Sequence, residues 1–278
     1  MLIPIVNRFT CTKNQLIHFK KMINNRNMKP ILDFTNENYK DHENNFSEIM
    51  NLCKKNENEK IAVKLTSLNI YDKTCVENYL DQIVLQCIKN NNTLLIDAEN
   101  YSVQDNICKI TDIFMEQYNR NHLNIYKTYQ LYRKDYLDIL KNDLNKYRNY
   151  AIGVKLVRGA YYNEDKKYNI LFDCIHDTHN NYNKGIEHFV MYNKKNDKLL
   201  CATHNDISLQ IAASYIDTYN LTNIEFSQLL GMSDTISNKL AEKYNVYKYL
   251  PYGNFKDTLP YLLRRLYENY PMLMNIFK

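Results

Sequence analysis

The chain has 278 residues, of which 45% are hydrophobic and 24% charged, and its formal net charge is +5. This balance is typical of a soluble globular protein that is long enough to bury a sizeable core. The sequence has no apolar run long enough for a transmembrane helix. With only five glycines and five prolines, collagen-like and Gly/Pro-rich disordered classes are also excluded.

Charge and cysteine patterns exclude two further kinds of site. Basic pairs such as Lys54/Lys55 and Lys166/Lys167 are scattered among acids, so no basic stripe predicts nucleic-acid binding. The seven cysteines are dispersed and never spaced as C-x-x-C, which favours a reducing compartment and no structural zinc. We expect asparagine runs such as residues 90–92 to lie in solvated loops.

The N-terminal segment lacks the apolar core of a secretory signal. It has no acidic residue before Asp33 but carries several basic residues, including Arg8, Lys13 and Arg26. An acid-poor, basic N-terminus is typical of a mitochondrial presequence, and the first helix of a lysine-rich protein has the same composition. Both interpretations stay open for residues 1–29, which we describe as an N-terminal extension or helix.

Short apolar runs that resemble buried strands recur along the rest of the chain, and each is followed by a longer stretch with helical spacing. Continuous apolar runs between polar turns are typical of strands buried on both faces. The eight runs are Pro30–Phe34, Ile61–Leu65, Thr93–Ala98, Ile125–Gln130, Ala151–Val157, Leu199–Thr203, Ile224–Leu229 and Val246–Leu250. The segment Cys75–Lys89 illustrates the helical stretches, with its apolar residues on one stripe.

Eight strand–helix units predict an α/β fold of the (β/α)8 TIM-barrel type, as a single domain over residues 30–278. A doubly wound open sheet is the competing arrangement. It seldom needs eight units and usually has a Gly-rich first turn, whereas this sequence has neither G-x-G-x-x-G nor a P-loop.

In a TIM barrel the functional residues lie where the strands end. Seven of the eight runs carry polar residues that we expect at this rim. They are Lys64, Asp97, Gln130, Lys155 with Arg158, Thr203 with His204 and Asn205, Glu225 with Gln228, and Tyr249. Four of the five glycines, residues 153, 159, 231 and 253, also lie in or beside these segments. Because buried polar groups need partners, this accumulation predicts a bound polar ligand.

The C-terminal segment carries a charged cluster on a predicted helix. Glu268 follows Arg264 by four residues and Arg265 by three, so all three side chains lie on one side of a helical turn. Paired guanidinium groups are suited to binding a carboxylate, with Glu268 holding one of them in place. A solvent-exposed salt-bridge face explains the same pattern equally well.

Several long motifs resemble the proline dehydrogenase family, in its eukaryotic-type, FAD-dependent branch. The motifs are VKLVRGAYY at residues 154–162, ATHN at 202–205, FSQLLGMSD at 226–234, VYKYLPYG at 246–253 and LPYLLRRLYEN at 259–269. AVKL at 62–65 and LLIDAE at 94–99 fit earlier parts of the same pattern. The motifs occur in the family's order and span roughly residues 30–270.

The resemblance implies a distorted (β/α)8 barrel that binds FAD non-covalently at the carboxyl ends of the strands. It implies oxidation of L-proline to Δ1-pyrroline-5-carboxylate by hydride transfer to the flavin, the first step of proline catabolism. It further implies transfer of the electrons to a membrane quinone, a mitochondrial location and a peripheral membrane contact. The chain is short for this branch, which leaves the quinone and membrane contacts open.

The resemblance also implies roles for individual residues. The cluster that binds the substrate carboxylate in the family is matched by Arg264, Arg265 and Glu268. Tyr249 matches the aromatic side chain that lies over the proline ring, and Tyr161 matches a tyrosine beside the substrate. Lys64 and Asp97 match the polar pair of the substrate pocket. The positions that match flavin contacts are Gln130, Lys155, Arg158, Gly159, Ala160, Thr203, His204, Asn205 and Gln228. Related hydroxyproline dehydrogenases tend to have serine at the position of Tyr249, so proline is the expected substrate.

Two other functions are compatible with a barrel of this kind. An inactive barrel with a binding or regulatory role would be expected to have lost some of the residues listed above. A phosphate-handling aldolase or lyase would be expected to carry a Gly-rich loop after the seventh or eighth strand, where only single glycines occur. His176, His179 and His188 could suggest a metal, but they lie among polar residues at spacings of three and nine, so we predict solvated histidines and no metal.

Overall fold

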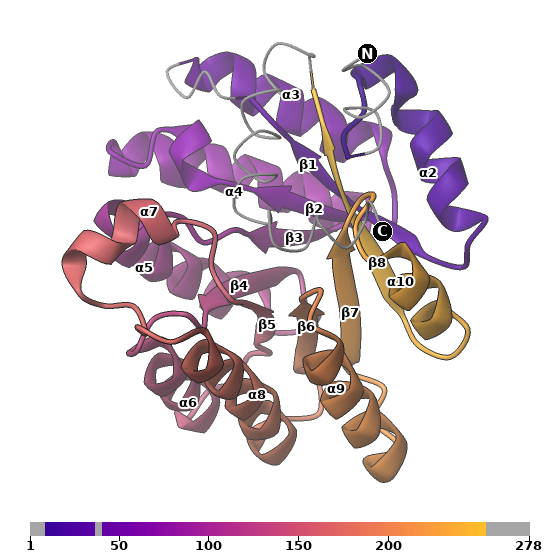
Figure 1. Ribbon diagram of the computed structural model, residues 1–278. Coiled ribbons are helices and arrows are strands. Elements are labelled where there is room, and N and C mark those ends of the chain that lie inside the picture. Colours follow the sequence, from indigo (N-terminus) through magenta and orange to yellow (C-terminus); the bar gives the residue numbers. More distant parts are fainter. Residues whose placement is uncertain (1–8, 37–40, 254–278) are drawn as a thin grey trace.

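The computed structural model describes residues 9–36 and 41–253, in which eight parallel strands alternate with helices and close into a barrel (Figure 1). The ring closes because β1 pairs in parallel with β8, so that Ile31 lies opposite Tyr249. The predicted (β/α)8 barrel is therefore confirmed, and the open-sheet alternative is wrong.

The strands coincide closely with the eight apolar runs of the sequence. They are β1 Lys29–Phe34, β2 Lys60–Val63, β3 Thr93–Ile96, β4 Ile125–Gln130, β5 Gly153–Val157, β6 Lys198–Ala202, β7 Ile224–Leu229 and β8 Val246–Tyr252. Each pairs with its neighbours in chain order. The boundaries differ from the predicted ones mainly at residues 64–65, 97–98 and 151–152, which lie just outside the strands.

The helices form the outer ring of the barrel (Figure 1). The α-helices are α2 Leu16–Asn24, α3 His42–Lys55, α4 Lys73–Lys89, α5 Tyr101–Tyr118, α6 Tyr136–Asn145, α7 Tyr162–Asp165, α8 Ile175–Tyr192, α9 Asp206–Tyr219 and α10 Asp234–Ala241. Short 3-10 turns are η1 Lys13–Gln15, η2 Leu65–Leu68 and η3 Lys166–Tyr168. Helix α2 precedes the first strand and packs against it, with Ile23 buried. No helix of these described segments is long and apolar enough to cross a membrane.

Alternate residues of each strand face the inside and the outside of the barrel. The inward-facing apolar residues make a small core of their own, composed of Ile31, Ala62, Leu95, Tyr126, Leu200, Tyr247 and Tyr249. Their chain neighbours, such as Leu32, Ile61 and Leu94, belong to the larger core between strands and helices. Burial on both faces explains why the strands read as continuous apolar runs.

Several helices begin at a polar residue whose side chain accepts a backbone N–H from the first turn. Asp41, Asp72, Asn100 and Asn205 do this for α3, α4, α5 and α9. Such caps satisfy backbone donors that have no partner within the helix. Each of these helices follows a strand in the chain, so its capped start belongs to the connection that leaves the carboxyl end of that strand.

Asparagine takes over turn positions that glycine usually occupies. Within residues 9–36 and 41–253, six asparagines adopt positive φ angles, among them Asn69 and Asn220 at helix carboxyl ends. Asparagine is the side chain that best tolerates this left-handed region. The expectation that residues 90–92 form a solvated loop is wrong for Asn92, which is 2% exposed and donates to the backbone oxygens of Cys53 and Asn56.

The amino-terminal end of the barrel interior holds a buried ion pair between Lys60 and Glu225. Together with two tyrosines, Tyr126 and Tyr247, these residues form what we call the floor cluster. Lys60 Nζ lies 2.9 Å from Glu225 Oε2, and both tyrosine hydroxyls donate to the same carboxylate at 3.2 Å. Glu225 therefore lies at the opposite end from the predicted rim, because it is one of the first residues of β7. Gly153, at the start of β5, is also at this end, where a Cβ would lie 2.6 Å from the Tyr126 ring.

Candidate active site

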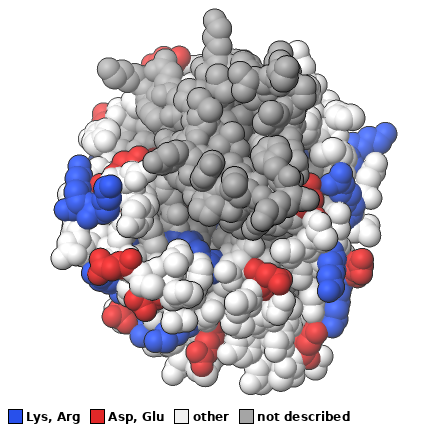
Figure 2. Space-filling view, in the orientation of Figure 1, with Lys and Arg blue, Asp and Glu red and all other residues white. Residues whose placement is uncertain are grey.

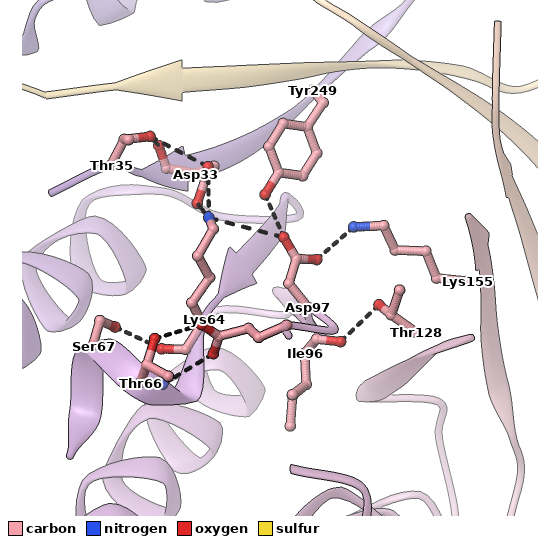
Figure 3. A network of polar contacts seen from close by, with 11 residues as sticks. Asp33, Thr35, Lys64, Thr66, Ser67, Ile96, Asp97, Thr128, Lys155 and Tyr249 are labelled. Atoms are coloured by element: carbon pink, nitrogen blue, oxygen red, sulfur yellow. Dashed lines mark hydrogen bonds and ion pairs between the residues drawn. The ribbon is translucent and has the colours of Figure 1, made fainter. Parts of the chain in front are cut away.

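Charged side chains converge inside the barrel one layer above its inner core. Five residues, which we call the polar network, meet there: Asp33, Lys64 and Asp97 from the ends of β1, β2 and β3 or just beyond them, Lys155 from within β5, and the hydroxyl of the inner-core residue Tyr249 from within β8 (Figure 3). Each of the first three follows an inner core residue, Ile31, Ala62 or Leu95, by two positions, so the strand period of two points it inward.

Asp97 joins three members of the polar network. Its Oδ1 lies 2.5 Å from Lys155 Nζ, and its Oδ2 accepts the Tyr249 hydroxyl at 2.6 Å and lies 4.0 Å from Lys64 Nζ. Lys155 Nζ also lies 4.9 Å from the centre of the Tyr249 ring. One carboxylate thus orients both a cation and an aromatic ring. Of the residues predicted from the sequence, the structure brings Lys64, Asp97, Lys155 and Tyr249 together.

Sequence reasoning missed two carboxylates at this end of the barrel. Asp33 is 1% exposed and accepts from Lys64 Nζ at 2.9 and 3.0 Å. Glu99 accepts the backbone N–H of Thr66 at 3.0 Å and its hydroxyl at 2.5 Å, which ties the segment after β3 to the turn after β2. A signal was present, since Asp33 is the only charged residue in the run Pro30–Phe34, the one run from which no rim residue was expected.

Burial acts on the two aspartates in the same direction, but their neighbours differ. Burial favours the neutral form of Asp97, yet Lys155 and Lys64 outweigh it and lower the pKa of this carboxyl. For Asp33, burial prevails over the nearby Lys64, and the charge of Asp97 adds to it, so its pKa is raised. Carboxyl groups whose pKa values are driven apart by a shared environment are typical of functional sites.

The side-chain oxygen of Gln130 accepts no hydrogen bond from any described residue. Its side chain is 1% exposed, its Nε2 donates to the backbone oxygen of Glu99 at 3.0 Å, and its Oε1 has no hydrogen-bond partner there. Buried carbonyl oxygens are rarely left in this state. The position fits a bound group that donates an N–H or O–H.

Arg158 presents a guanidinium whose described partners are all uncharged. It donates to His179 Nδ1 at 2.9 Å, Thr203 Oγ1 at 2.5 Å and Ser208 Oγ at 2.9 Å, and it stacks on the ring of Tyr182. Burial lowers its pKa. Since the start of α9 also lies here, this region favours an anionic group.

The other predicted rim residues follow β5 and β6. Gly159 has φ +144°, and a Cβ there would lie 2.3 Å from the Tyr132 ring, so only glycine fits. Ala160 and Tyr161 follow it, and Tyr161 is 8% exposed at the start of α7. His204 Nε2 accepts the backbone N–H of Leu229 at 3.0 Å, and Asn205 caps α9.

Gln228 lies differently from the other predicted flavin contacts. Glu225 and Leu229 face the barrel interior, so Gln228, which lies at the opposite parity of the strand, faces outward. Its Oε1 accepts the hydroxyl of Ser237 in α10 at 3.0 Å, and its Nε2 donates to the backbone oxygen of Thr203 at 3.3 Å. It therefore links β7 to α10 and to the end of β6.

Some predicted residues lie elsewhere. Arg264, Arg265 and Glu268 fall outside the described residues. Residues 9–36 and 41–253 contain no group of three or more metal-ligating side chains. On the face shown in Figure 2, acidic and basic side chains are interspersed.

A closed (β/α)8 barrel with convergent charged side chains at the carboxyl ends of its strands has the layout of the barrel enzymes. The family model described as "Proline dehydrogenase" matches residues 19–274. The chain belongs to the proline dehydrogenase family.

Known relatives agree with this assignment. The chain is 32% identical over 225 residues to proline dehydrogenase 1, mitochondrial, of Dictyostelium discoideum, covering 74% of this chain and 39% of that protein. It is 34% identical over 216 residues to hydroxyproline dehydrogenase of Xenopus laevis, covering 72% and 46%. The chain thus spans less than half the length of these two relatives.

Solved structures show the same fold. Proline utilization A from Bdellovibrio bacteriovorus superimposes with a TM-score of 0.87 at 19% identity, covering 96% of this chain and 33% of that one. Proline utilization A from Corynebacterium freiburgense gives a TM-score of 0.86 at 18% identity, covering 97% and 32%.

Proposed function

We propose that the chain is an FAD-dependent proline dehydrogenase that oxidises L-proline to Δ1-pyrroline-5-carboxylate and passes the electrons to a membrane quinone. The observation that carries the proposal is the convergence of Lys64, Asp97, Lys155 and Tyr249 on one end of the barrel. Membership of the family supports the same activity. The mitochondrial names of relatives and the acid-poor N-terminus support a mitochondrial location.

The described residues fit FAD. Its pyrophosphate needs cationic and backbone donors, which Arg158 and the start of α9 supply. Its ring system carries an N–H donor, which suits the buried Gln130 Oε1. Gly159 lets the backbone turn at φ +144° against the Tyr132 ring, one residue after Arg158. When bound, FAD accepts the hydride.

The protein's own residues have the task of positioning the substrate. Oxidation removes a hydride from Cδ, the ring carbon next to nitrogen that carries no carboxylate, and a proton from the nitrogen; the hydride would go to the flavin and the proton to solvent, which leaves a C=N bond. Tyr249 offers a flat wall for the ring, held by its hydrogen bond to Asp97. Lys155, held by the same carboxylate, would stabilise the negative charge that develops on a reduced flavin. Arg264 and Arg265 remain the proposed partners of the substrate carboxylate.

Anaerobic titration with proline tests this proposal. We expect the purified protein to be yellow and L-proline to bleach its flavin absorption band, because hydride transfer reduces the ring. D-proline serves as the matched control and should bleach the band far more slowly. A colourless protein that takes up no added FAD would instead favour an inactive barrel.

Tyr249→Ser is expected to shift substrate preference toward hydroxyproline. Serine removes the ring that closes over the substrate and leaves room for a ring hydroxyl. A change of this kind in one pocket contact is worth about 1–3 kcal/mol, or roughly 10- to 200-fold in the ratio of the two kcat/KM values. Steady-state kinetics with both substrates measure the ratio. Tyr249→Phe keeps the ring and loses only the bond to Asp97, so it should retain the preference for proline; equal ratios for the two variants would contradict the assignment.

A further inference from the structure

Lys64 has two carboxylates within reach and is paired with the one that sequence reasoning missed. Its Nζ lies 2.9 and 3.0 Å from the two oxygens of Asp33 but 4.0 Å from Asp97 Oδ2 (Figure 3). The shorter contacts have hydrogen-bond geometry, whereas the contact with Asp97 is a longer ion pair. Asp33 is therefore the main described counter-ion of Lys64.

Asp97 is already engaged by other groups. One of its oxygens binds Lys155 Nζ at 2.5 Å, and the other accepts the Tyr249 hydroxyl at 2.6 Å. If Lys64 moved toward Asp97, it would compete with both contacts and bring two ammonium groups together. The second carboxylate removes this competition, because the network then holds two cations and two anions.

Asp33 is itself fixed in place. It lies in β1 between Ala62 of β2 and Pro251 of β8 in the strand register, and it is 1% exposed. The hydroxyl of Thr35 donates to its Oδ2 at 3.3 Å, and the Thr35 backbone N–H donates to Tyr252 O at 2.9 Å. A carboxylate held by two neighbouring strands can set the position of a flexible lysine side chain.

We propose that Asp33 is a positioning residue for proline oxidation: it holds the Lys64 ammonium on the β1 side of the site and so keeps Asp97 for Lys155 and Tyr249. This proposal rests on the proposed function. It assigns no contact between Asp33 and the substrate, so the whole effect of Asp33 passes through Lys64.

A double-mutant cycle tests this dependence, using FAD-loaded Asp33→Asn, Lys64→Met and the double variant. Asp33→Asn keeps the shape of the side chain and removes its charge. We expect it to lower kcat/KM for proline by at least about tenfold, since breaking a buried ion pair leaves an uncompensated charge. In the Lys64→Met background the same change should alter kcat/KM by no more than about twofold, because the group through which Asp33 acts is absent.

The outcomes separate the alternatives. Equal fold losses from Asp33→Asn in both backgrounds, or wild-type kcat/KM in Asp33→Asn, would overturn the positioning role. If wild-type protein binds flavin but proline fails to reduce that flavin, the proposed function would be overturned instead. The thermal unfolding midpoints of the same four proteins then test the pairing directly: a double variant at least as stable as either single variant supports it, and additive losses refute it.

Discussion

Asp97→Asn is expected to lower kcat/KM for proline by about 100- to 1,000-fold while FAD remains bound. The substitution leaves the ammonium groups of Lys155 and Lys64 facing an uncharged amide and disturbs the bond that holds the Tyr249 ring. Removing one partner of a buried charge pair costs about 3–5 kcal/mol, and the lower part of this range corresponds to the expected loss if the geometry is needed in the transition state. Flavin reduction measured by stopped flow gives the value.

A matched control removes a carboxylate outside the barrel. Asp112→Asn deletes one of two carboxylates around Lys127, on the outer face of β4, and leaves Asp143 as the partner at 2.9 Å. Its kcat/KM should stay within about twofold of wild type, as expected for a substitution away from the reacting groups. Equal losses in both variants would show that Asp97 acts through overall stability.

The stability effect of Asp97→Asn should depend on pH. Because Lys155 and Lys64 lower the pKa of Asp97 against the effect of burial, its charged form stabilises the folded state. That contribution is fully present above the unfolded value of about 3.9 and is lost as the pH falls through the lower folded value. The difference in unfolding midpoint between wild type and Asp97→Asn should therefore be constant near neutral pH and shrink below about pH 4.

Lys60→Met is expected to destabilise the protein by about 3–5 kcal/mol, because it leaves the Glu225 carboxylate buried without its cation. The side chains of the pair are only 8% and 6% exposed, and Lys60 also lies over the rings of Tyr126 and Tyr247 at 4.8 and 4.7 Å. Urea unfolding followed by circular dichroism measures the change in free energy.

Two comparisons make the Lys60 result interpretable. Lys60→Met/Glu225→Gln removes both charges and should recover a large part of the loss, since no unpaired ion remains. Lys73→Met breaks an exposed pair with Glu77, where the lysine is 75% exposed, and should change stability by less than about 1 kcal/mol. Similar losses for Lys60→Met and Lys73→Met would contradict the role of the floor cluster.

Strand periodicity explains why the fold and part of the site could be predicted. The apolar runs are buried on both faces, so the positions of all eight strands could be predicted from the sequence. Lys64 and Asp97 lie just beyond strand ends, where a barrel collects its functional groups. The motifs around Lys155 and Tyr249 then supplied the family.

Position along a strand was harder to predict than the strand itself. Glu225 and Gln228 lie on the same predicted strand, yet one belongs to the floor cluster and the other faces α10. The location of each residue depends on where the strand starts and on whether its odd or even positions point into the barrel. An apolar run that is buried on both faces shows neither of these. For the same reason Asp33 was passed over inside an otherwise apolar run.

The sequence by itself determined the eight repeated units, the barrel class and the family, because these depend on local patterns and on contiguous motifs. Only the tertiary structure decided that Lys64 pairs with Asp33, that Asp97 joins Lys155 to Tyr249, and that Gln130 keeps a buried acceptor without a donor among the described residues. These contacts join side chains up to 152 positions apart. They arise when closure of the barrel brings side chains from distant strands within hydrogen-bond reach. No single segment of the sequence determines how far apart two such side chains lie.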